Sequence, residues 1–434
     1  MKKANDASAR AEWGGGGALL VVAAAAGMSL SAVSSASLGV MMAPLEQDLG
    51  WTRTQISFGA SLVALVAVVF GAAAGLAIDR FGARRIALLA AFLMCGGIAL
   101  MSSIGDDLWQ WWLLWGLVGI AGSAMPTVWI APVSRRFTAG RGLAVAVALS
   151  GTGVSTSLVP LLANWLVEEH GWRAAYLGLA ALWAAVVFPL VLLFFRTAEA
   201  PRGAANADRS GEALIKPGLT AREGFATRAF YTLALAAFLS MSAGVALILN
   251  LVPVLRSTGL TPAVAASIAG IIGMATILGR IVGGALMDRM SAKAIAAICA
   301  AGATVLPLAL LLFPGSAPAA AAAVFIYGLL GGAKVPALVY LASRHFGARA
   351  FGVLYGAVNT MVALGVGLGP VIANYVYDVT RSYTPVMWTA APFLLAAALL
   401  YASLGRYPDF ASTVEPSTTE PPSRKGSWRL RSAP

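Results

Sequence analysis

Two cations stand inside long apolar runs of the sequence, where an isolated charge is costly. Arg280 follows Gly279 in one run, and Lys334 precedes Pro336 in another. Placing a cation at bilayer depth costs roughly 2.5–3.5 kcal/mol on insertion scales, so such residues usually face a protein interior and serve a substrate or an ion. No Asp or Glu lies deep in any of the runs to neutralise them. An arriving anion would supply the missing partner, because the Arg fork matches a carboxylate and Lys acts as a point charge.

Each cation also has a purely structural interpretation that the sequence leaves open. Arg280 lies eight residues before Asp288, about 12 Å along a helix, and its long stem could extend toward a helix end. Lys334 could bond backbone carbonyls that Pro336 leaves free. Of these interpretations we favour a site for a small organic anion, most simply a carboxylate.

The composition shows which elements must position the two cations. The chain is 59% hydrophobic and 11% charged, with a mean hydropathy of +0.80, which no soluble domain requires. A helix needs about 20 apolar residues to cross a bilayer, and lipid cannot satisfy exposed backbone groups. We therefore predict an all-α membrane protein with twelve spans, at 18–45, 54–78, 86–105, 109–133, 142–167, 174–196, 229–255, 263–287, 294–313, 317–342, 351–377 and 384–405.

An internal repeat divides the chain into two halves. The phrase that ends in Asp79-Arg80 recurs around Asp288-Arg289, and the same offset aligns Pro44 with Pro253. Duplicated membrane units are typical of transporters. The predicted division is a segment 1–17, a six-helix bundle 18–196, a linker 197–228, a second six-helix bundle 229–406 and a tail 407–434.

The repeat also predicts an asymmetric site. Arg280 and Lys334 align with Gly71 and Met125, so the first half has no matching cation. We expect the first half to contribute shape through Met125 and Trp129. Polar side chains of the second half are candidate ligands, each with an alternative role in helix packing: Asn250, Tyr327, Tyr355 and Asn359. Asn164 and Asn374 match each other across the repeat and are expected to pack or gate.

The distribution of charge argues for a membrane rather than a nucleic acid as the partner. The net charge is +12, but most Lys and Arg fall in alternate loops, as the positive-inside rule requires. Both termini are then predicted to be cytoplasmic, in a bacterial inner membrane. The basic tail is expected to lie on lipid headgroups, and the protein is expected to be a monomer that binds no nucleic acid.

One motif carries a family resemblance. Gly75-x-x-x-Asp79-Arg80-x-Gly82-x-Arg84 lies between the second and third predicted spans and resembles the signature loop of the major facilitator superfamily. The resemblance implies two six-helix bundles around a cavity that opens alternately to each side. It also implies a conformational latch, formed by that motif and by its degenerate copy Asp288-Arg289. Helix termini attract opposite charges, which gives the latch a physical basis, although the loop could simply set the topology.

A finer resemblance concerns the cation in the eighth span. Gly279-Arg280 is similar to the intramembrane Arg of monocarboxylate transporters and oxalate–formate antiporters, which binds the substrate carboxylate. Monocarboxylate transporters place an Asp one turn earlier, where this chain has Thr276, and a Lys in the first span, which is absent here. The antiporters have their Lys in the eleventh span, whereas Lys334 lies in the tenth. We therefore expect anion exchange, or symport in which the substrate carries the proton.

Other functional classes are less well supported by the residues. The chain has no phosphate-binding loop ending in Lys-Ser or Lys-Thr, so direct ATP drive is not expected. The sequence shows no pattern typical of a metal cluster, a pair of catalytic carboxylates or a catalytic triad. We therefore expect that the protein is not an enzyme and binds no cofactor or metal. Two alternatives remain. The first is an exporter of drugs or amphiphiles, which commonly uses a membrane-embedded acid that the apolar runs of this chain lack. The second is a non-transporting sensor that has retained the same fold.

Overall fold

The computed structural model describes residues 12–14, 16–137, 141–195, 218–287, 290–347 and 349–408, and within them the chain is helical with no strand. The first half contains α2 (Gly17–Leu30), α3 (Val33–Leu49), α4 (Arg53–Phe81), α5 (Ala83–Leu100), α6 (Leu108–Arg136) and α7 (Arg141–Phe194). The second contains α9 (Ala221–Ala226), α10 (Arg228–Leu249), α11 (Leu251–Ser257), α12 (Pro262–Met287), α13 (Ala292–Gly302), α14 (Val305–Leu312), α15 (Ala317–Phe346), α16 (Phe351–Thr380) and α17 (Thr384–Ser403). The predicted tail 407–434 and segment 1–17 lie largely outside the described residues.

These helices account for the predicted spans. Among the described residues, 10 helices are long and apolar enough to cross a membrane, and α4, bent by 41° near its middle, makes 11. Helix α7 is counted once, although Gly171 (φ 78, ψ 168) breaks it. Glycine adopts this conformation without a Cβ clash, and the chain reverses there. Counting both parts of α7 gives the twelve predicted spans, in an all-α membrane protein.

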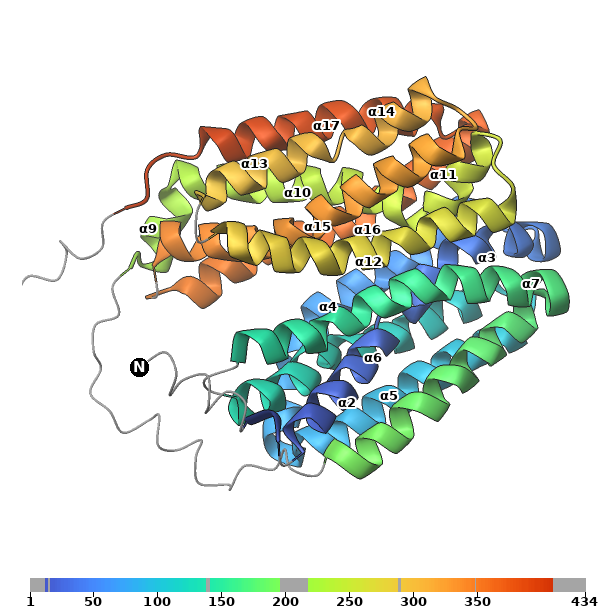
Figure 1. Cartoon of the computed structure of the whole chain (residues 1–434), viewed down its shortest axis with the longest axis horizontal. Coiled ribbons are helices and arrows are strands. Elements are labelled where there is room, and N and C mark those ends of the chain that lie inside the picture. The colour runs from blue at the N-terminus through green and yellow to red at the C-terminus, as the bar shows by residue number, and fades with distance from the viewer. Residues whose placement is uncertain are drawn as a thin grey trace, which may run out of the picture.

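Figure 1 shows the two halves as separate groups of helices that lie against each other. We call the end at which α2 and α10 begin the linker end, and the end at which α3 and α16 finish the far end. The halves meet along two seams, between α4 and α16 and between α7 and α12. The second half therefore positions α12 and α15, with their two cations, at or next to a seam.

The apolar core is continuous between the two halves at one end only. One continuous core runs through the first half and into the far end of the second, where it includes Leu255, Ile268 and Leu394. The linker end of the second half has a separate core, which includes Leu233, Leu341 and Tyr401. Because close packing between side chains holds helices together in a membrane, the shared core joins the two halves at the far end.

Candidate substrate site between the two halves

Arg280 reaches across the seam between α12 and α7. Its Nη1 donates to the Leu149 carbonyl oxygen at 2.6 Å and to Thr152 Oγ1 at 3.2 Å, both in the other half. The side chain is half-buried, and no carboxylate pairs with it among the described residues. The oxygens that its Nη1 contacts are therefore neutral, and they accept its hydrogen bonds without compensating the charge.

Lys334 turns toward α10 within its own half. Its Nζ lies 3.4 Å from the Ser240 carbonyl oxygen. A methyl group built on Gly244 would lie 3.8 Å from that nitrogen and 2.8 Å from the Tyr327 hydroxyl. The absence of a side chain at Gly244 thus leaves room for both polar groups. The structure brings Lys334 and Tyr327 together, as two donors at one glycine.

The two cations emerge at the same level of neighbouring helices. A methyl group on Gly332 would lie 2.8 Å from the Arg280 backbone nitrogen, so α12 and α15 touch there, two residues before Lys334. Their side chains diverge, however, one toward α7 and the other toward α10. Arg280 therefore offers a bidentate cation at the seam, and Lys334 offers a point charge inside the second half.

Two further candidate ligands lie on α16. Asn359 is exposed and Tyr355 is half-buried, with its ring stacked 5.3 Å from that of Phe351. No contact in the described part of the chain joins either residue to Arg280 or Lys334. Asn250 is fully buried between α10 and α11. Its Nδ2 donates to Ala246 O at 2.9 Å, while Oδ1 has no partner among the described residues.

The two expected contributors from the first half lie inside their own bundle. Trp129 and Met125 are both fully buried, and Trp129 Nε1 lies 2.9 Å from Met125 Sδ. The indole packs on Gly27, where an added methyl group would lie 2.2 Å from the ring. In this conformation neither side chain contacts Arg280. Gly27 has no side chain, which leaves room for the Trp129 indole to pack against α2.

The predicted latch is described only in part. Asp288 and Arg289 lie outside the described residues, as do the Asp79 side chain and the surroundings of Gly75. Arg84 Nη2 donates to the Leu192 carbonyl oxygen at 3.0 Å, near the C-terminal end of α7, where a cation is favourable. Gly82 (φ 87) ends α4, and the Arg80 guanidinium lies 5.4 Å from the Phe81 ring. The contacts described for Arg80 and Arg84 therefore both lie within the first half.

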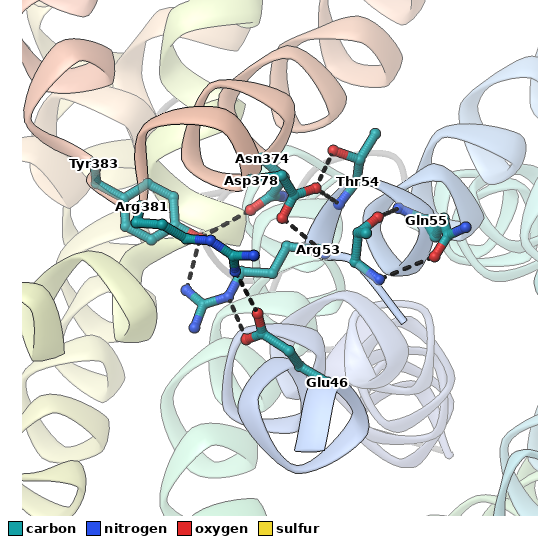
Figure 2. Close-up of polar contacts among 9 residues, drawn as sticks. Glu46, Arg53, Thr54, Gln55, Asn374, Asp378, Arg381 and Tyr383 are labelled. Carbon is teal, nitrogen blue, oxygen red and sulfur yellow. Dashed lines mark hydrogen bonds and ion pairs between the residues drawn. The ribbon is translucent and has the colours of Figure 1, made fainter. Parts of the chain in front are cut away.

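A polar cluster at the far end was not predicted from the sequence, and it links the two halves directly (Figure 2). Asp378 Oδ1 accepts from the Arg53 backbone N–H at 3.2 Å, and Oδ2 accepts from the Thr54 N–H at 2.9 Å and from its hydroxyl. These N–H groups open helix α4, so an acid of one half caps a helix of the other.

The Arg53 side chain extends this far-end cluster. Its Nε pairs with Glu46 Oε2 at 2.9 Å, and Nη1 donates to the Tyr383 hydroxyl at 3.1 Å. That hydroxyl donates in turn to Asn374 Oδ1 at 2.8 Å, while burial raises the pKa of Tyr383 and keeps it a neutral donor. Arg381 adds an exposed pair with Glu46 at 3.5 Å. Only the match of Asn374 with Asn164 hinted at this region.

Comparison with known proteins identifies the framework that carries these residues. A model described as Major Facilitator Superfamily matches residues 24–370, and again 233–433. The chain belongs to the Major Facilitator Superfamily. Members of this superfamily are membrane transporters, so the protein is a transporter and not an enzyme.

Individual relatives agree with this assignment. Monocarboxylate transporter 13 of Rattus norvegicus is 27% identical over 396 residues, which cover 89% of this chain and 87% of that protein. The gallate transporter of Pseudomonas putida is 29% identical over 294 residues, 61% of this chain and 64% of that one. The crystal structure of a D-xylose-proton symporter superposes with a TM-score of 0.72 at 15% identity, covering 90% of this chain and 98% of that one. This superfamily fold places Arg280 on a seam between the halves.

Proposed function

We propose that the protein is a secondary active transporter that moves a small organic anion, a carboxylate, by alternating access. The observation that carries this proposal is Arg280, a half-buried cation at the seam whose partners are the neutral oxygens of Leu149 and Thr152. A carboxylate offers two acceptors to the guanidinium fork and neutralises its charge. Lys334 is the second cationic ligand, with Tyr327 as a hydroxyl donor beside it.

Substrate binding at Arg280 provides a physical link to the conformational cycle. Arg280 bonds the first half directly in this conformation, so a carboxylate must replace or share those bonds. A ligand shifts a conformational equilibrium only through its different affinity for the two states. By exchanging a bond between the halves for a bond to itself, the substrate would favour their rearrangement.

The sidedness follows from the positive loops. By the positive-inside rule the linker end is cytoplasmic in a bacterial inner membrane, and the far-end cluster closes the opposite side. The shared core at the far end supports a state open toward the cytoplasm. The position one turn before Arg280 is Thr276, whose hydroxyl donates to the Ile272 carbonyl oxygen at 2.7 Å. We therefore favour anion exchange, or a proton carried by the substrate itself.

A thermal-shift experiment tests the proposal. Purified protein is heated with mono-, di- and aromatic carboxylates and with cationic dyes. A ligand at 100 times its Kd should add about 2.7 kcal/mol of stability. We expect a carboxylate to stabilise the wild type but not Arg280→Ala, with unchanged stabilisation of Arg256→Ala, which removes an exposed Arg at the far end.

Other outcomes would identify the alternatives. Stabilisation by dyes alone, equal in both variants, would contradict the carboxylate site and indicate an exporter of drugs or amphiphiles. Carboxylate binding without flux into proteoliposomes would indicate a sensor. Flux of a carboxylate that is lost in Arg280→Ala and retained in Arg256→Ala would confirm transport through this site.

A further inference from the structure

An apolar groove runs between α13 and α17 on the outer surface of the second half. Figure 1 shows these helices side by side, on the face of the second half that lies away from the first half. The groove has a volume of about 400 Å³, well above the roughly 150 Å³ that holds benzene. Both helices belong to membrane spans, so the groove faces the hydrocarbon of the bilayer. Only apolar side chains line it, among them Ala297, Ala301, Leu395, Leu399 and Ala402.

The groove leads to a lysine at its linker end. Ala297 and Ala301 follow Lys293 at intervals of four residues, so all three lie along one face of α13. Lys293 Nζ donates to the Leu404 carbonyl oxygen at 3.0 Å, just beyond the end of α17 at Ser403. The Lys293 side chain thus bridges the two helices that form the groove, one helical turn, about 6 Å, before Ala297.

Two further cations surround this end of the groove. Arg406 follows Leu404 by two residues and is exposed. The Arg344 guanidinium of α15 lies 5.1 Å from the ring of Tyr407, the neighbour of Arg406 in the chain. Neither of these cations nor Lys293 pairs with a carboxylate among the described residues. Side chains from separate elements therefore gather positive charge at one place, which we call the basic rim: Lys293, Arg344 and Arg406.

The basic rim lies at the depth of lipid headgroups. Lys293 directly precedes the predicted span 294–313, and Arg406 directly follows the predicted span 384–405. Cations at this level attract anionic headgroups. The first N–H groups of α13 point the same way, because a helix N-terminus carries partial positive charge. A headgroup with a net negative charge therefore fits the rim better than a zwitterionic one.

We propose that the groove and the basic rim form a binding site for one anionic phospholipid. An acyl chain lies in the groove, and the phosphate binds at the rim. A second copy of this chain fits less well, because a symmetric contact would bring two basic rims together. The bound lipid connects α13 with the end of α17 and so stabilises the second half. Because the site faces the bilayer and not a seam, its occupancy does not depend on which substrate is carried.

The test measures lipid binding to the purified full-length protein in a neutral detergent. The melting temperature is followed while dioleoyl phosphatidylglycerol, dioleoyl phosphatidylcholine or inorganic phosphate is added. We expect phosphatidylglycerol alone to raise the melting temperature, and to do so saturably, since bound ligand stabilises in proportion to occupancy. Equal stabilisation by phosphatidylcholine would overturn the role of the basic rim. Equal stabilisation by inorganic phosphate would overturn the role of the groove.

Two substitutions of exposed residues locate the site. Arg406→Gln should lower the apparent affinity for phosphatidylglycerol about fivefold, the effect of one cation at the membrane surface. Ala402→Leu narrows the groove and should lower that affinity about tenfold, because about two methylenes of the chain lose their contacts. The matched controls change exposed residues elsewhere and should leave the affinity unchanged: Arg85→Gln at the linker end of the first half, and Ala185→Leu on α7.

The remaining outcomes each decide against the site. Unchanged affinity in both Arg406→Gln and Ala402→Leu would show that the lipid binds elsewhere. A dimer that forms without lipid and is lost in Ala402→Leu would assign the groove to a second copy. None of the four variants changes a residue of the proposed anion site, so carboxylate binding should persist in all of them. The lipid site and the proposed function can therefore fail separately.

Discussion

The two seams between the halves are formed by helices that correspond through the internal repeat, but their chemistry differs. Along α4 and α16, the far end is closed by the Asp378 cap on helix α4, and Ser61 Oγ donates to the Gly367 carbonyl oxygen further down. Along α7 and α12, Gly153 and Gly273 pack backbone against backbone. One seam is fastened by charge, whereas the other is fastened by close packing.

The internal repeat shows which residues differ between the two seams. The offsets that align the halves place Arg53 opposite Pro262 and Asp378 opposite Glu168. Both seams therefore keep an acid at the far end, but only one keeps a cation beside it. Glu168 is exposed, whereas Asp378 is half-buried. The cation of the α7–α12 seam is Arg280, deeper along the helix, and its counterpart on α4 is Gly71. Duplication supplied the framework, and the placement of single charges distinguishes a latch from a binding site.

The largest effect is expected from breaking the charged seam. Asp378→Ala removes three hydrogen bonds to Arg53 and Thr54. Bonds to a charged acceptor contribute about 1.5–3 kcal/mol each, so a net loss of about 3 kcal/mol would raise the far-open population by roughly 100-fold. Ser35 lines a cavity of about 100 Å³ between the two halves. A cysteine at this position should then react faster with an impermeant thiol reagent added from the far side.

The repeat supplies the matched control for that experiment. Glu168→Ala removes the equivalent acid from the other seam, and the labelling rate should stay unchanged. Cys95 and Cys299 are buried and should contribute little background. An equal increase in labelling in both variants would show that the Asp378 bonds do not hold the far end closed.

The contrast between the seams also marks where sequence reasoning succeeded and where it could not. The spans were predictable because lipid demands long apolar runs. That Arg280 would lie between helices was also predictable, because a cation inside such a run is costly in lipid, and its role as a ligand stays a prediction. Neither Arg53 nor Asp378 was singled out from the sequence as a candidate site residue. They are 325 residues apart, and nothing local in the sequence indicates that they are partners.

The first-half residues illustrate a second limit. The repeat offset placed Met125 opposite Lys334, on the assumption that equivalent helices present equivalent faces. Gly27 instead receives the Trp129 ring and keeps both side chains inside the bundle. A missing side chain on one helix decided the orientation of another, and such three-dimensional packing is invisible to an alignment of the halves.

An intermediate effect is expected from the close-packed seam. Gly273→Ala would place a methyl group 2.1 Å from the Gly153 carbonyl oxygen and 2.3 Å from Ser157 Oγ, so α7 and α12 must separate. Overpacking of this kind costs about 1–3 kcal/mol. The melting temperature should fall, and Arg280-dependent carboxylate binding should weaken with it.

Gly71→Ala is the matched control for the packed seam. Gly71 has nothing within 4 Å of the added methyl group, so the substitution should be neutral or stabilise helix α4 by up to about 1 kcal/mol. If Gly273→Ala left stability and binding equal to those of Gly71→Ala, the close contact of α7 with α12 would not be what fastens this seam.

The smallest effect is expected from making the two seams alike. Pro262→Arg introduces, at the start of α12, the residue type that opens α4, on the seam whose other helix, α7, carries Glu168 just before its break at Gly171. The new pair would be solvent-exposed and should add less than about 1 kcal/mol, with a gain in melting temperature that disappears in high salt. The gain should also vanish in Pro262→Arg combined with Glu168→Gln, since the cation then has no acid to face. A gain that persists in the double variant would come from the loss of proline, and symmetry of charge would then play no part in it.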